Sequence, residues 1–185
     1  LSHYEFYERG LVDTAVVATT DIQPFLDHKV PGLWAYYCCC QSGGFLSNRL
    51  LAMPGERTRV IGFQLFLNNI VGFLHWGYNF YNSSYSDEPV DPYAVTDAGG
   101  HFQSGDSYIV YPGADGPLDS LRHELMRAAW QDVALLQRLA EKKGRAAAEK
   151  LLLDHGFAKN FTTYPRDLAT LKQIRAGALL LLADR

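Results

Sequence analysis

Hydrophobic residues along the chain gather in three short runs that do not alternate with polar residues. The runs cover residues 12–20, 33–40 and 72–79, and β-branched and aromatic side chains dominate them. Strands have this composition when helices cover both faces of a parallel sheet. We therefore predict three parallel, neighbouring strands, with ligand-binding groups at their carboxyl ends.

Apolar residues that recur every three to four positions predict the helices. Residues 58–70, between the second and third strands, predict one helix, and residues 121–140 predict a long amphipathic helix with Asp119 or Ser120 as its N-cap. The apolar face of the long helix is predicted to be Leu121, Leu125, Ala129, Val133, Leu136 and Ala140. Helix follows strand in the order typical of an α/β protein.

The end of the chain is also predicted to be helical. One helix covers residues 145–155 and stops at Gly156, and another begins around Pro165 and runs to the C-terminus. Before this tail, a polar loop of residues 83–104 leads into a short strand at residues 106–111. A structureless stretch of that length usually covers a site or has a function of its own.

Three parallel strands are too few to close a barrel, which needs about eight. We therefore expect the chain to be the C-terminal part of a barrel, with residues 72–79 as the last strand of the wall. Residues 1–116 are predicted to hold barrel strands and helices, and residues 117–185 a helical segment packed on them. The first residue, Leu1, is not a start methionine, so we expect a segment upstream.

The composition of the chain limits the classes of ligand that it is expected to bind. The net charge is −3 and the chain has no cluster of basic residues, which argues against nucleic acid as a ligand. No apolar run approaches the ~18 residues of a membrane span. Aromatic residues make up 13% of the chain, and aromatic faces stack on sugars and bases, so the composition points weakly to such ligands.

The three cysteines are consecutive, at Cys38, Cys39 and Cys40. No second cluster at zinc spacing accompanies them, so we predict no metal site and no cofactor. In a strand, Cys38 and Cys40 share one face, and a disulfide between neighbours is strained. We interpret all three as small buried hydrophobic residues, which leaves the compartment open.

Several stretches, in order and spacing, resemble the catalytic domain of glycoside hydrolase family 123. The resembling stretches are residues 33–39, Arg59 with Gly62, residues 72–79, 91–93, 105–106, 110–113 and 120–124, and Asp132 with Leu135 and Leu136. Together they cover roughly residues 12–140.

The resemblance implies a (β/α)8 TIM-like barrel that cleaves N-acetylhexosaminides, typically N-acetylgalactosaminides, with retention of configuration. In this family the 2-acetamido oxygen of the substrate attacks the anomeric carbon, an Asp orients that group, and an adjacent Glu serves as acid and base. The resemblance also implies an extracellular or periplasmic location.

The resemblance places the catalytic Asp-Glu pair on a strand upstream of the matched stretches. The chain has one such doublet, Asp87 and Glu88, with Pro89 after it. A polar stretch precedes it instead of an apolar strand, so we interpret it as a solvated loop doublet and leave the catalytic residues unassigned.

Six residues near the strand ends are candidates for substrate binding. They are Tyr36, Tyr37, Trp76, Tyr78, Asn79 and Asp106. The apolar face of an indole complements the C–H face of a pyranose, whereas a core position is the alternative for Trp76. Tyr36 and Tyr37 point to opposite faces of a strand, so we expect one of them to reach the ligand.

Two functions remain open. The first is part of a retaining N-acetylhexosaminidase, and the second is a carbohydrate-binding or scaffold module without the catalytic acids. In either case the partner is a carbohydrate. We expect the isolated chain to pair with another copy, or with the missing N-terminal part, because three strands leave an edge and apolar faces bare.

Overall fold

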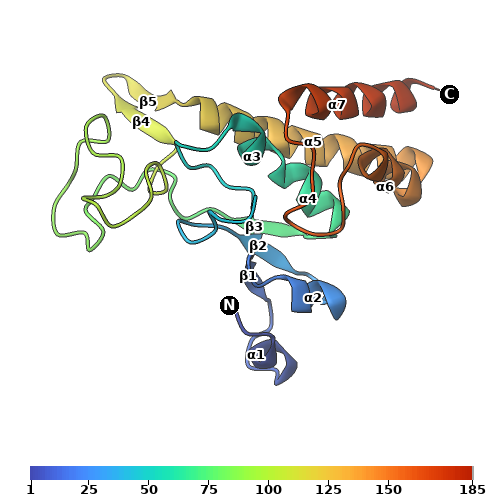
Figure 1. Cartoon of the computed structure of the whole chain (residues 1–185), viewed down its shortest axis with the longest axis horizontal. Helices are drawn as coiled ribbons and strands as arrows, with labels where there is room; N and C mark the ends of the chain where they lie inside the picture. The colour runs from blue at the N-terminus through green and yellow to red at the C-terminus, as the bar shows by residue number, and fades with distance from the viewer. Residues whose placement is uncertain (185) are drawn as a thin grey trace.

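The computed structural model describes residues 1–184, and Figure 1 shows the course of the chain. The first half holds short elements: α1 (Tyr4–Glu8), β1 (Val16–Ala18), α2 (Gln23–Asp27), β2 (Trp34–Tyr36), α3 (Gly55–Arg59), α4 (Ile61–Leu67) and β3 (Gly72–Leu74). The second half holds β4 (Val110–Gly113), β5 (Gly116–Asp119), α5 (Leu121–Lys143), α6 (Arg145–Asp154) and α7 (Leu168–Ala183).

The strands β1, β2 and β3 form one parallel sheet in the order of the sequence. Ala35 in the centre of β2 pairs with Val17 on one side and Phe73 on the other. This confirms the prediction of three parallel neighbours, and the fold is a mixed α/β fold with a parallel sheet. The sheet is open, and no barrel closes within residues 1–184.

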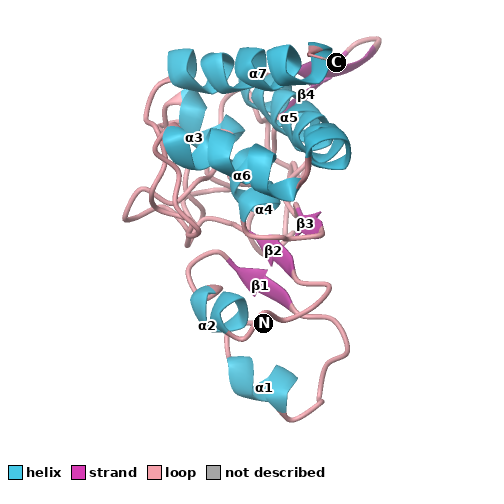
Figure 2. Cartoon of the chain, turned by 90° about the vertical axis from the view of Figure 1, so that its right-hand side faces the viewer, coloured by secondary structure: helices cyan, strands magenta, loops and turns pink. Residues whose placement is uncertain are grey.

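One face of the sheet lies against helices. Val17 and Ala35 are fully buried in a cluster with Phe25 of α2, Ile61 of α4 and Ala129 of α5. Figure 2 shows α3 to α7 gathered on one side of the strands, while α1 and α2 lie near β1. The other face carries Trp34 and Leu74, about two fifths exposed, so the apolar strands have only one covered face.

The tail helices form a second core with α4. Phe63 and Phe66 of α4 are buried with Leu136 of α5, Leu152 of α6 and Ile174 of α7. The N-cap prediction for the long helix is confirmed, because the Ser120 side chain accepts a hydrogen bond from the backbone N–H of His123. None of the helices among residues 1–184 is long and apolar enough to cross a bilayer.

The buried face of α5 differs from the predicted one. Leu121 is 74% exposed, whereas Arg122 and Asp132 are buried. Arg122 donates to the carbonyls of Arg49 and Gly105, and Asp132 accepts from Arg59. Counting apolar positions misses this face because an arginine bound to carbonyls and an aspartate in an ion pair occupy two places on it.

Several boundaries also differ from prediction. The helix expected at residues 58–70 is divided into α3 and α4 at Val60, and the last helix begins at Leu168, capped by Asp167, instead of near Pro165. In place of the strand expected at residues 106–111, the chain forms β4 from Val110, which pairs with β5 in an antiparallel hairpin. The segment from Pro117 onward was expected to be helical, but β5 runs through Asp119.

Candidate functional site

A hollow of about 350 Å³ opens at the carboxyl ends of β2 and β3. It is lined by Tyr36, Cys38, Cys39, Leu74, Trp76, Phe102 and Asp106. Larger hollows lie elsewhere, including one of about 430 Å³ where β3 begins, beside α4 and α5. We take the hollow at the strand ends as the candidate site, since sites in parallel α/β proteins collect there.

Strand register explains why these side chains meet. Tyr36 pairs with Leu74, so the two side chains point to the same, open face of the sheet. Residues two positions further along each chain, Cys38 and Trp76, continue on that side. The hollow is therefore an extension of the open face beyond the strand ends.

Trp76 supplies the largest apolar surface of the hollow. Its ring meets the edge of Phe102 with centroids 5.3 Å apart and lies 5.7 Å from Phe80. These contacts fix the indole without covering it completely. Its Nε1–H is buried beside the Asp106 carboxyl, so the indole offers a ligand its apolar face.

Asp106 is the acidic residue in the wall of the hollow. Its side chain is fully buried, and Oδ1 accepts a hydrogen bond from Arg49 at 3.0 Å. Oδ2 has no partner within residues 1–184. Burial raises the pKa of this carboxyl and outweighs the opposing effect of the Arg49 guanidinium. Asp106 therefore lies in the wall of the hollow with its carboxyl group shielded from solvent, between Arg49 and the Trp76 indole.

A glycine allows this arrangement. A Cβ at Gly77 would lie 2.0 Å from the carbonyl oxygen of Asp106, so no other residue permits the backbone after β3 to pass this close. Arg49 donates to the same carbonyl at 2.6 Å, and its guanidinium would also lie 2.9 Å from a Cβ at Gly77. The position of Asp106 thus depends on Gly77 and Arg49 together.

The core side of the site is positively charged. Arg49 and Arg122 are both buried, with Asp106 as the acidic partner of Arg49. Burial, together with the charges of Arg49 and Arg122, lowers the pKa of His75 to about 3. His75 is therefore neutral at physiological pH and is a poor proton donor for catalysis.

The structure brings three of the six candidates into the hollow: Tyr36, Trp76 and Asp106. Tyr37 instead lies in the core, with its ring edge on Phe73 and the Arg49 guanidinium 5.2 Å from its centre. Alternation along the chain after β2 sends it to the covered face. Of the two tyrosines, only Tyr36 is placed to meet a ligand there.

Tyr78 and Asn79 are exposed but lie outside the hollow. The Tyr78 hydroxyl is 3.3 Å from Nε2 of His123, at the start of α5. Asn79 forms an isolated antiparallel bridge with Tyr108. Both residues tie the chain after β3 to the segment near the β4–β5 hairpin.

The doublet Asp87 and Glu88 is exposed in the long loop. The backbone N–H groups of both residues lie within hydrogen-bond distance of the Ser83 hydroxyl, which closes a tight turn. Neither residue lines the hollow. Figure 1 shows this loop extending beyond the end of the sheet.

Sequence reasoning missed Phe102, Leu74 and the cysteines as lining residues. We expected the second strand to run through Cys40 with all three cysteines buried, but β2 ends at Tyr36 and Cys40 is exposed. Side-chain donors cause this early end, because Asn48 and Gln103 bind the carbonyls of Cys38 and Cys39. Phe102 gives no signal in a loop whose path the sequence does not reveal.

Comparison with known proteins indicates the family and the fold of the chain. The model of the family described as glycoside hydrolase 123, catalytic domain, matches residues 1–139. A family 123 glycoside hydrolase from Clostridium perfringens, studied for glycolipid glycan hydrolysis, has a similar structure, with a TM-score of 0.57 at 16% sequence identity. The similarity covers 97% of this chain and 33% of that one, so the chain spans about a third of that structure's length. No curated protein sequence matches the chain.

Proposed function

Because the chain belongs to the glycoside hydrolase 123 catalytic-domain family, we propose that it is the C-terminal part of a (β/α)8 barrel that cleaves N-acetylhexosaminides by a retaining, substrate-assisted mechanism. Residues 1–116 contribute strands and helices to the barrel, and residues 117–185 form a helical segment packed against them. The hollow at the ends of β2 and β3 binds part of the sugar.

The observation that carries this proposal is the pairing of Trp76 with Asp106 in one hollow. A pyranose has apolar C–H faces and hydroxyls at its rim. The indole face complements the first, and we propose that Asp106, whose buried Oδ2 has no hydrogen-bond partner within residues 1–184, accepts from the second. Tyr36 and Leu74 extend the apolar wall along the open face of the sheet.

The chain's own residues then have binding roles. Asp106 holds a hydroxyl or the acetamido N–H, with its charge balanced by Arg49. Trp76 orients the ring. In the proposed mechanism the acetamido-orienting Asp and the acid/base Glu come from a strand that is not among β1, β2 and β3.

Binding is tested by Trp76→Ala, measured by calorimetry with N-acetylgalactosamine. We expect binding to weaken by about 1–3 kcal/mol, because burial and stacking of the indole are lost. Trp130→Ala is the matched control, since Trp130 is 38% exposed on α5 and does not line the hollow. Unchanged affinity in a folded Trp76→Ala variant would assign the indole to the core.

A non-catalytic carbohydrate-binding module is the second candidate, and the exposed position of Asp87 and Glu88 favours it for the chain in isolation. We expect the purified chain to show no turnover of an aryl N-acetylgalactosaminide, since general acid–base help alone is worth roughly 10²–10⁴-fold. Turnover that Glu88→Gln abolishes would instead assign catalysis to the loop doublet.

A further inference from the structure

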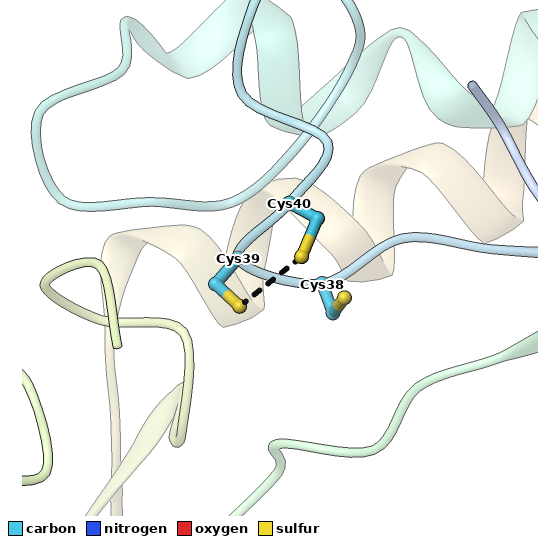
Figure 3. Close-up of side chains that lie close together, drawn as sticks. All are labelled: Cys38, Cys39 and Cys40. Carbon is cyan, nitrogen blue, oxygen red and sulfur yellow. Dashed lines mark hydrogen bonds between the residues drawn. The ribbon is translucent and has the colours of Figure 1, made fainter. Parts of the chain in front are cut away.

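The three consecutive cysteines form a cluster of thiols at the end of β2. The sulfur atoms of Cys38, Cys39 and Cys40 all lie within 4.8 Å of one another, and those of Cys39 and Cys40 are 3.8 Å apart. None of the three is in a disulfide. Figure 3 shows the side chains grouped around one turn of the backbone.

These distances suit a shared metal ion. Sulfurs that bind one ion at about 2.3 Å lie roughly 3.8–4.0 Å apart in tetrahedral or trigonal sites. The Cys39–Cys40 separation already has this value. The Cys38 thiol is partly exposed, lies within 4.8 Å of the other two sulfurs and now donates to Gln41 Oε1 at 3.3 Å, a contact that a cation would replace.

The turn that carries the thiols is held by side chains from distant segments. Asn48, itself fully buried, donates to the carbonyls of Cys38 and Gln41, both at 2.8 Å. Gln103 donates to the carbonyl of Cys39 at 2.8 Å. Gln41 Oε1 accepts from the backbone N–H of Cys38 at 2.9 Å.

This frame fixes the backbone around the cysteines before any ligand arrives. A ligand then does not have to pay the conformational entropy of ordering the turn, which is the main benefit of a preorganised site. The same hydrogen bonds satisfy the backbone carbonyls of a turn that leaves the strand, so the thiols are held close together by the fold itself.

We propose that Cys38, Cys39 and Cys40 bind one soft, thiophilic cation, of the class of Zn²⁺, Cd²⁺ and Cu⁺, at the rim of the hollow. Thiolate sets without hard oxygen ligands select such ions. Binding replaces the thiol protons, so up to three protons leave as the three metal–sulfur bonds form.

The test is an anaerobic titration of the purified, reduced chain with Cd²⁺, followed by the sulfur-to-cadmium charge-transfer absorption. We expect one ion per chain, release of protons and, for a chain loaded with Zn²⁺ first, displacement of the Zn²⁺ by Cd²⁺. Cys40→Ser should lower the affinity by more than about 100-fold, because even a lost outer partner of a ligand costs about 10–100-fold.

Two variants serve as comparisons. Gln103→Ala loosens the frame without removing a thiol, and we expect an affinity about 10-fold lower. His101→Gln removes an exposed imidazole that is not part of the cluster and should leave the titration unchanged. Bound Cd²⁺ should also protect the thiols of the wild-type chain from an alkylating reagent. This readout does not depend on any variant being folded.

Three results would overturn the proposal. One is equal Cd²⁺ affinity for the wild-type chain and Cys40→Ser. Another is an ion shared between two chains. The third is a purified chain whose mass is lower by two hydrogens because Cys39 and Cys40 have joined in a disulfide that persists under reduction. None of these results depends on whether the hollow binds a sugar.

Discussion

The two faces of the sheet β1–β2–β3 are built from alternate residues of the same strands, yet they have different surroundings. On the covered face, Val17 and Ala35 are fully buried against α2, α4 and α5. On the open face, Trp34 is 40% and Leu74 41% exposed. Apolar residues lie on both faces of the sheet, but within residues 1–184 helices pack against only one of the two faces.

The difference separates folding from site formation. The covered face carries the core that holds the sheet to the helices. The open face leads directly into the candidate hollow through Tyr36 and Leu74. Because the matched structure is about three times as long as this chain, we propose that the open face is the inner wall of a barrel completed by other strands.

The largest difference in stability between the two faces is expected for substitutions of two neighbouring tyrosines, Tyr36 and Tyr37. Tyr37→Ala removes a fully buried ring and should destabilise the fold by about 3–5 kcal/mol. Tyr36→Ala alters the open face and should cost much less stability while weakening sugar binding. Denaturant unfolding measures the first effect and calorimetry the second. Equal destabilisation by both substitutions would show that the two faces are packed alike.

A second contrast compares a buried with an exposed ion pair on α5. Asp132 is buried and accepts from both Arg59 and Arg175, so Asp132→Ala should cost about 3–5 kcal/mol by leaving buried charge unpaired. Glu124→Ala breaks the exposed contact with Arg127 and should cost less than about 1 kcal/mol. Thermal unfolding of the two variants provides the measurement. Similar losses would mean that Asp132 does not anchor the helix.

The smallest expected effect concerns the open face itself. We expect the isolated chain to self-associate through it, and Leu74→Glu should weaken that association by about tenfold or more, since a buried leucine is worth about 1.5–3 kcal/mol. Leu180→Glu is the control, because Leu180 is 69% exposed on α7, away from the sheet. Sedimentation measures the mass. A wild-type monomer, or an equal effect of both substitutions, would contradict the role of this face.

Some of the candidate site could be predicted from residue types and strand positions alone. Trp76 and Tyr36 follow from aromatic residues near the ends of strands that share one face. Asp106 is a candidate from its place at the start of the predicted strand 106–111, but its burial beside Arg49 is not visible in the sequence. The residues are 57 positions apart, and a pattern of single residues carries no information on such a pair.

The sequence by itself determined the α/β order, the parallel sheet, the cap at Ser120 and the helix stop at Gly156, where φ is +88°. These features are local or periodic, so neighbouring residues are enough to specify them. Only the tertiary structure decided that Tyr37 is in the core, that α5 buries Asp132, and that the cysteines leave the strand for a turn. Each of these depends on partners far along the chain, because buried charges and backbone carbonyls take the positions where their hydrogen bonds are satisfied.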